Sequence, residues 1–163
     1  MKIDYQKAKL SDYEEIYTVM QTSARELSRK AYSDQLKDTF DKFYIDKTPV
    51  YIRQTLENQH NYTIVAKNKN RIIGFIQIKF HNKIGNVNHL YILPGYEGNS
   101  IGTQLFGLVK ERAVQLNITK LYTESTLNAL SYYEKFGFIN KGLIPDESAY
   151  NLELELKSLE KHS

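Results

Sequence analysis

The chain has 163 residues, of which 41% are hydrophobic and 25% are charged, and its formal net charge is +3. These values are typical of an ordinary globular protein, so we expect a single domain over residues 1–163. The absence of cysteine excludes a disulfide scaffold, a cysteine nucleophile and a thiolate zinc site. It also fits a reducing compartment, so we expect a cytoplasmic protein.

Charge and aromatic patterns argue against nucleic-acid and membrane partners. Acidic and basic residues are interspersed, and the thirteen tyrosines are scattered rather than interleaved with a basic stripe. The first ten residues, MKIDYQKAKL, lack the apolar segment of a signal peptide. The most apolar stretch, residues 72–78, is too short to span a bilayer. We therefore expect neither nucleic-acid nor membrane binding.

The N-terminal third reads as a strand followed by helices. Residues 2–8 are predicted to form the strand. Ser11-Asp12-Tyr13-Glu14 has the spacing of a capping box, which predicts a helix beginning at Ser11. A second helix is expected to begin near Ser33. Thr48 followed by Pro49 predicts the cap and first position of a third helix, which runs through Leu56.

The rest of the chain alternates strands with two helices. Strands are predicted at 62–67, 71–80, 84–93, 118–125, 138–143 and 150–156, and helices at about 98–117 and 128–136. The first three of these strands follow one another closely and predict an antiparallel meander. The order indicates an α/β (α+β) fold with a mixed, mostly antiparallel sheet and helices on both faces.

One short stretch, Gly98-Asn99-Ser100-Ile101-Gly102, fits two motifs. It matches the G-x-S-x-G turn that carries a hydrolase nucleophile, and it also matches a glycine-rich turn whose backbone N–H groups bind a phosphate. Residues 94–97 separate the preceding strand from the motif, and the only histidine after Ser100 is His162. Both facts argue against the hydrolase. The glycine spacing fits neither G-x-G-x-x-G nor a P-loop. This leaves two interpretations of the stretch, an anion-binding turn and an ordinary strand-to-helix turn.

Two segments together resemble a known family. VNHLYILPGYEGNSIGTQLFGLV, residues 87–109, resembles motif A of the GNAT acetyltransferases, and TLNALSYYEKFGF, residues 126–138, resembles motif B. The order of predicted elements matches this family over nearly the whole chain. The departures are Glu97 where the family has Gln or Arg, Ser100 where it has Gly, and Asn99 where a positive charge is frequent. The resemblance implies a splayed pair of parallel strands formed by 87–93 and 118–125.

The resemblance also implies an enzyme that moves an acetyl group directly from the acetyl-CoA thioester to a primary amine. The alternative is a non-catalytic acyl-CoA-binding module with the same fold. The family binds the pantetheine arm along the first splayed strand, the pyrophosphate on the following loop, and the other side of the arm at motif B. The cofactor-binding residues implied are Leu90, Tyr91, Ile92, Glu97, Gly98, Asn99, Ser100, Ile101, Gly102, Thr103, Asn128 and Tyr133.

Several catalytic expectations follow from the resemblance. Tyr133 corresponds to the family tyrosine that protonates the leaving thiolate, and the Ile92 N–H would stabilise the carbonyl oxygen. Tyr132 is expected to pack in the core. Alternation along the strand places Asn86 and Asn88 at the usual positions of a general base, where they could only order a water. The same register turns His89 to the opposite face as a half-exposed side chain.

A small-molecule or peptide amine is expected to bind between the helices of residues 11–56, including segment 24–40, and the loop 143–149. No histidine or carboxylate cluster has metal-ligand spacing, so acetyl-CoA is the only cofactor expected and no metal site is predicted. A homodimer is left open as the assembly.

Overall fold

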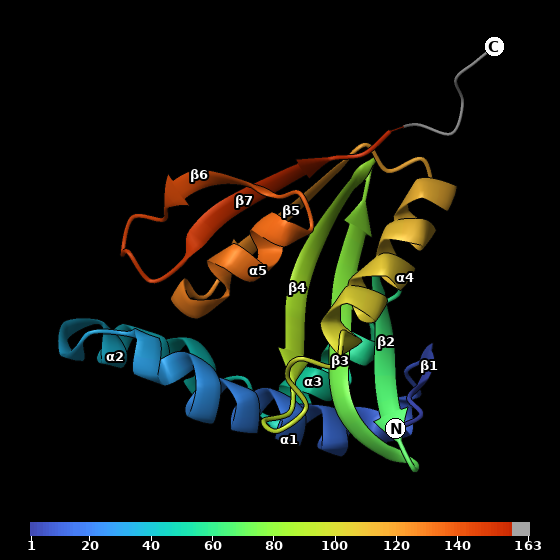
Figure 1. Ribbon diagram of the computed structural model, residues 1–163, viewed down its shortest axis with the longest axis horizontal. Helices are drawn as coiled ribbons and strands as arrows, with labels where there is room; N and C mark the ends of the chain where they lie inside the picture. Colours follow the sequence, from blue (N-terminus) through green and yellow to red (C-terminus); the bar gives the residue numbers. More distant parts are fainter. Residues whose placement is uncertain (158–163) are drawn as a thin grey trace.

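The computed structural model describes residues 1–157 and orders them as a seven-stranded sheet with flanking helices (Figure 1). The strands are β1 Asp4–Lys7, β2 Asn61–Asn68, β3 Arg71–His81, β4 Ile84–Ile92, β5 Lys120–Ser125, β6 Ile139–Leu143 and β7 Tyr150–Glu155. The α-helices are α1 Tyr13–Ser23, α2 Asp34–Ile45, α3 Pro49–Glu57, α4 Ile101–Gln115 and α5 Leu130–Lys135. Shorter helical turns are η1 Leu10–Asp12, the π-helical η2 Ala24–Ser28, η3 Arg29–Ala31 and η4 Leu127–Ala129.

The sheet is mixed, as the sequence predicted. Its strand order is β1-β2-β3-β4-β5-β7-β6, and each neighbouring pair is antiparallel except β4 and β5. These two parallel strands pair only over Ile84–Val87 and Lys120–Thr123. Figure 1 shows them diverging beyond this point. The predicted splayed pair is therefore present in the fold.

Helices cover both faces of the sheet. In Figure 1, α4 crosses in front of β2 and β3 while α3 lies behind them, and α1 packs against α3, β3 and β4. Ile16 and Met20 from α1, Phe75 from β3 and Leu105 from α4 are completely buried. Burial of such side chains is the main stabilising contribution to a fold of this size, at about 1.5–3 kcal/mol each.

Two helix starts test the capping predictions. Thr48 caps α3 as predicted, because its Oγ1 accepts a hydrogen bond from the Tyr51 N–H at 3.2 Å. The predicted capping box at Ser11 is wrong. The helical turn begins earlier, at Leu10, and the buried Asp12 carboxylate accepts from the Lys9 N–H at 2.8 Å. The capping carboxylate is therefore that of Asp12, two residues before the predicted Glu14, and it lies at the third position of the turn.

A β-bulge in β4 overturns the predicted facing of His89. Gln77 pairs with His89 but the next residue, Ile78, pairs with Val87, so Asn88 is an extra residue in β4. Such a bulge places two successive side chains on one face. His89 therefore lies on the same face as Asn88, next to Tyr51 of α3, and it is buried at 4% exposure rather than half-exposed.

Candidate active site

A side-chain hydrogen bond joins β4 and β5 at the last residue pair before the two strands separate. Val87 and Thr123 form the last pair, and the Thr123 hydroxyl donates to the Val87 carbonyl at 2.9 Å. Asn88 and Glu124 are the first residues beyond that pair. Past this apex, β4 continues to Ile92 without pairing to β5.

The register of β4 decides which backbone groups face the split. The Leu93 N–H donates to the Ile73 carbonyl at 2.7 Å. Hydrogen-bonded pairs recur at every second residue of an antiparallel ladder, so Tyr91 exchanges its bonds with Phe75 of β3. The backbone N–H and C=O of Leu90 and Ile92 consequently point away from β3, toward the split, and they need partners there.

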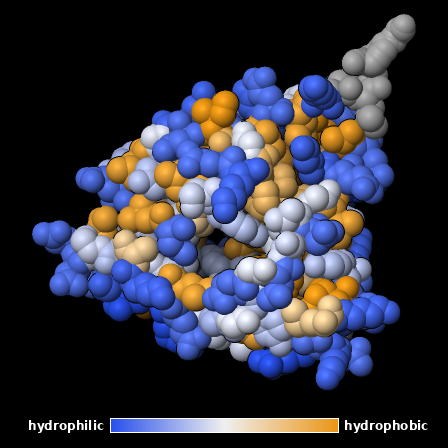
Figure 2. Space-filling model, in the orientation of Figure 1, coloured by the Kyte–Doolittle hydropathy of each residue, from blue (hydrophilic) through white to orange (hydrophobic). Residues whose placement is uncertain are grey.

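A cavity of about 480 Å³ lies at this split, and we call it the loop cavity. Figure 2 shows a hollow near the middle of the molecular face on which α4 lies. Of the predicted cofactor-binding residues, Asn99 and Tyr133 do not line the loop cavity. The others do: Leu90, Tyr91, Ile92, Glu97, Gly98, Ser100, Ile101, Gly102, Thr103 and Asn128.

The loop between β4 and α4 presents the N-terminus of α4 to this cavity. Ser100 precedes the helix with a left-handed backbone at φ 60°, and Gly98 has φ 81°. Only glycine adopts this conformation without strain, which explains why glycine is usual at the position of Ser100. The Ser100 side chain makes no capping hydrogen bond. The first backbone N–H groups of α4 are thus donors without helical acceptors at the positive end of the helix dipole.

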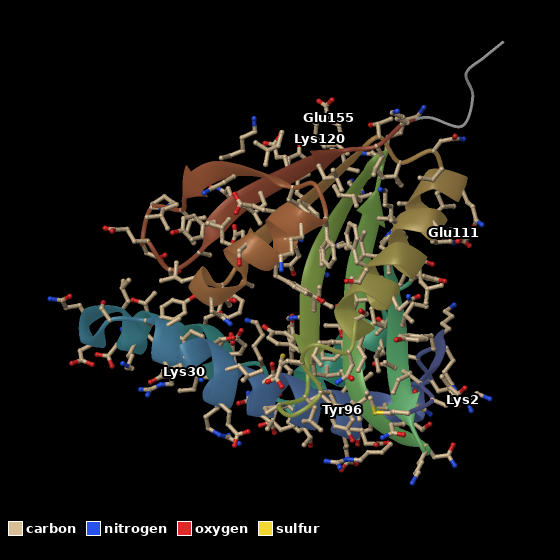
Figure 3. The ribbon with its side chains drawn as sticks, viewed as in Figure 1. Lys2, Lys30, Tyr96, Glu111, Lys120 and Glu155 are labelled. Carbon is tan, nitrogen blue, oxygen red and sulfur yellow. The ribbon has the colours of Figure 1, made fainter. Side chains whose placement is uncertain are left out.

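The two unusual side chains of the loop bind its own backbone. The Glu97 carboxylate accepts from the Gly95 N–H at 2.8 Å. The Asn99 amide donates to the carbonyls of Tyr96 at 3.0 Å and Glu97 at 3.3 Å. Figure 3 labels Tyr96 in this loop. Glu97 and Asn99 therefore stabilise the conformation of the loop through its backbone.

Gly102 lies directly against the Tyr132 side chain in the loop cavity. A Cβ atom added to Gly102 would lie 1.4 Å from the Tyr132 hydroxyl oxygen and 2.6 Å from its Cζ. Tyr132 is half-buried, lines the cavity and stands edge-on to Phe136 with ring centroids 4.9 Å apart. The expectation that Tyr132 packs in the core is therefore wrong. Gly102 makes room for its ring.

Tyr133 lies behind the cavity wall rather than on it. Its side chain is 6% exposed and packs edge-on to Phe138. Burial raises the pKa of Tyr133 well above its ordinary value, and a hydrogen bond with the Thr123 side chain partly offsets this effect. Because Thr123 bonds Val87 at the apex, the Tyr133 hydroxyl lies where the strands part. Asn128 lies within η4, and Thr126 and Ala129 hold the N-cap positions of η4 and α5.

A second cavity, of about 390 Å³, adjoins the first and is called the aromatic cavity. Tyr91 lines both. Its hydroxyl meets that of Tyr44 at 2.5 Å. Burial raises the pKa of Tyr44 to about 12, and burial also raises the pKa of Tyr91 well above its ordinary value. Both phenols therefore remain protonated near neutral pH.

The walls of the aromatic cavity come from the segments expected to surround the acceptor. The helical layer supplies Tyr32, Thr39, Phe40, Lys42, Phe43 and Tyr44, and the loop after β6 supplies Ile144, Asp146, Ser148 and Ala149. The Tyr32 hydroxyl donates to the Ser148 carbonyl at 2.5 Å and accepts from the Leu127 N–H at 3.3 Å. Tyr32 therefore ties this loop and η4 to the helical layer.

A third cavity, the polar cavity, occupies about 630 Å³ between α3 and strands β2 to β4. His89 lines it, and its Nε2 lies 2.9 Å from the Tyr51 hydroxyl. Burial, helped by the charge of Lys47, lowers the pKa of His89 to about 4. Asn86 donates to the Asn88 side chain at 2.8 Å, and both line the same cavity. This confirms that Asn86 and Asn88 share one face.

Several site residues escaped sequence reasoning. Glu124 lines both the aromatic and the polar cavity, and it follows the last β4–β5 pair directly. Its signal in the sequence is its position directly after Thr123, in the predicted strand that faces β4 across the split. Leu27 and Ser28 of η2 and Lys135 of α5 line the loop cavity. Irregular π-helical turns are frequent at functional sites, but nothing in the local sequence marked this one.

Two negative findings apply to residues 1–157. No group of three or more histidine and acidic side chains there is arranged to hold a metal ion. None of the helices in the same range has both the length and the apolar character of a membrane span. His162, the histidine that follows Ser100 in the sequence, lies outside the described residues.

Comparisons with known proteins support one family. The family model described as "Acetyltransferase (GNAT) domain" matches residues 28–147. The fold is similar to that of the PaiA N-acetyltransferase from Thermoplasma acidophilum, solved in complex with coenzyme A. The TM-score is 0.78 and the identity 22%, over 96% of this chain and 100% of that one.

Two further solved structures have the same fold. A GCN5-related N-acetyltransferase from Rhodopseudomonas palustris is similar at TM-score 0.77 and 18% identity, over 96% of this chain and 97% of that one. The ribosomal-protein-S18-alanine N-acetyltransferase from Escherichia coli is similar at TM-score 0.71 and 10% identity, over 99% of this chain and 100% of that one. Among curated protein sequences, none matches this chain.

Proposed function

Because the chain belongs to the GNAT acetyltransferase family, we propose that it transfers the acetyl group of acetyl-CoA directly to a primary amine. One observation carries the proposal: the loop cavity and the aromatic cavity meet at Tyr91, at the split between β4 and β5. A cofactor in one cavity and an acceptor in the other would bring thioester and amine together there. The solved PaiA complex with coenzyme A supports the cofactor.

The loop cavity suits the cofactor in two ways. The unpaired backbone groups of Leu90 and Ile92 can bond the amides of the pantetheine arm as a further strand would. The pyrophosphate can accept hydrogen bonds from the N–H groups at the start of α4, from Ile101 to Thr103, where the helix dipole favours an anion. Lys135 brings a positive charge to the same cavity, which partly compensates for the missing charge at Asn99.

The reaction forms a C–N bond and breaks the C–S bond. The amine attacks the thioester carbonyl, and an N–H group aimed at the developing oxyanion stabilises it. We assign this donor to Ile92, whose N–H faces the split. The thiolate of CoA leaves and needs a proton.

We assign Tyr133 as the donor of the proton that the leaving thiolate takes up. Its raised pKa keeps the phenol protonated at neutral pH, as a donor must be. The same burial makes full release of the proton costly, so we expect transfer only as negative charge builds on the sulfur. The proton that the amide nitrogen loses can then restore the phenol, which balances the exchange.

An alkyl ammonium must first lose one proton before it attacks. We assign this step to Glu124, directly or through a water held by Asn88. Glu124 lies beside the apex of the split and lines the aromatic cavity. Its negative charge would also attract the protonated acceptor. His89 is less suited, because it lines the polar cavity but not the aromatic cavity and its Nε2 already bonds the Tyr51 hydroxyl.

The first experiment measures thiol release from acetyl-CoA with a panel of primary amines. An enzyme releases CoA in an amine-dependent manner. A non-catalytic acyl-CoA-binding module would instead show only stabilisation by the cofactor. Either function requires binding, and a ligand at 100 times its Kd adds about 2.7 kcal/mol to the stability. No thermal shift with millimolar acetyl-CoA or CoA would contradict the assignment of the loop cavity.

A further inference from the structure

The polar cavity adjoins the acceptor side, and apart from Asn88 and Glu124 its lining residues have no part in the reaction described above. It shares Phe43, Asn88 and Glu124 with the aromatic cavity. A molecule whose amine lies beside Glu124 can therefore extend into either cavity. The aromatic cavity leads toward Tyr91 and the cofactor, whereas the polar cavity leads under α3.

Two residues that line the polar cavity have buried polar side-chain atoms without hydrogen-bond partners. His89 is 4% exposed, and its Nδ1 has no hydrogen-bond partner among residues 1–157. The buried Oδ1 of Asn61, another lining residue, also lacks a partner there. A polar atom left in this state costs about 1–3 kcal/mol, so the wall of this cavity is polar at the expense of stability.

The lining of the polar cavity includes the positively charged Lys47 and the negatively charged Glu124. The Lys47 ammonium lies over the Phe43 ring at 4.1 Å from its centroid and 5.2 Å from that of Tyr51. The Lys47 side chain is only 16% exposed, while its ion-pair partner Asp46, at 3.4 Å, is 79% exposed. Such an exposed partner compensates a buried ammonium weakly. Glu124 is the only carboxylate among the residues that line this cavity.

We propose that the polar cavity binds a carboxylate of the acceptor through Lys47, so that the acceptor is a primary amine that also carries a carboxylate. The inference rests on the proposed function and names its substrate class. The ammonium of such an acceptor lies beside Glu124, and the carboxylate lies at the Lys47 ammonium. Lys79 adds a second positive charge to the same cavity.

The test compares amines that differ only in the carboxylate. Suitable pairs are ω-aminocarboxylates of two to six carbons with alkylamines of equal length, lysine with cadaverine, and phenylalanine with 2-phenylethylamine. We expect at least one carboxylated member to have the higher kcat/KM. Lys47→Met should lower its kcat/KM by about 10- to 100-fold, the usual range for a charged hydrogen bond, and should leave its matched amine unchanged.

Two further variants separate charge from folding. Lys47→Arg should keep the preference for the carboxylated member. Lys30→Met removes the same charge from the exposed lysine labelled in Figure 3, and it should change neither member of a pair. The inference is overturned if the wild-type protein shows no preference for carboxylated amines in any pair. It is also overturned if Lys47→Met preserves the preference.

A binding measurement separates this inference from the proposed function. In an NMR titration of the wild-type protein, 5-aminopentanoate should shift the ring signals of His89, and pentylamine should not. This readout needs no turnover. If neither probe shifts the His89 signals, or both shift them equally, the carboxylate site is refuted even in an active acetyltransferase. A shift by 5-aminopentanoate alone supports the site even if no amine in the panel is acetylated.

Discussion

Gly102→Ala provides a sharp test of how the loop cavity is built. The new methyl group would lie 1.4 Å from the Tyr132 hydroxyl oxygen, so the ring must leave its place against Phe136. Overpacking of this kind typically costs about 1–3 kcal/mol. The helix preference of alanine over glycine returns up to about 1 kcal/mol. We expect a net loss of up to about 2 kcal/mol, which is several degrees in Tm.

The sign of the effect should reverse when the ring is absent. In a Tyr132→Ala background the same Gly102→Ala change should stabilise the protein, because only the helix preference remains. Gly107→Ala is the matched control in the same helix, since nothing lies within 4 Å of its added Cβ, and it should stabilise by about 1 kcal/mol.

Urea unfolding of the four variants and the wild type measures these differences. Acetyl-CoA binding should weaken in Gly102→Ala, because the displaced ring enters the cavity, and should be unchanged in Gly107→Ala. Equal effects of Gly102→Ala with and without the Tyr132 ring would refute the reasoning.

Three other predictions address the remaining residues. Ser100→Ala should keep nearly full turnover, because the loop acts through its backbone; complete loss of activity in a folded variant would revive the hydrolase interpretation. Tyr133→Phe should lower turnover by about 10²-fold or more while KM for acetyl-CoA changes only a few-fold, and a raised KM with normal turnover would make it a positioning residue instead. His89 has a folded pKa of about 4 and an unfolded value near 6.5. The unfolded chain alone therefore gains its proton as pH falls from 6.5 to 4, and His89→Gln should reduce the loss of stability over that interval, as measured by urea unfolding at each pH.

The features that the sequence predicted well are those encoded locally. Strand periods, turn residues and the Thr48 cap fix most element bounds to within a few residues. The two family motifs, with the elements between them, indicated the split sheet and most of the residues that line the loop cavity. Each of these signals lies within a short continuous segment.

The errors concern features that depend on a partner segment. The bulge at Asn88 exists only in the register of β4 against β3, and strict alternation therefore placed His89 on the wrong face. Helix α5 has only six residues. The way in which it packs on its neighbours determines that Tyr133 faces the interior and Tyr132 the cavity. Glu124 gains its significance from the residue at which β5 stops pairing with β4. Local patterns carry none of this information.

The short pairing of β4 with β5 also bears on how the protein opens. Four residues of each strand are the seam between two antiparallel half-sheets, β1 to β4 and β5 to β7. Segments joined by few hydrogen bonds can open as separate cooperative units, which native-state hydrogen exchange detects. A ligand that bonds to β4 inside the split would extend this seam. The bound cofactor would then help to hold the two half-sheets together. Backbone amides of β5 to β7 would exchange more slowly in its presence.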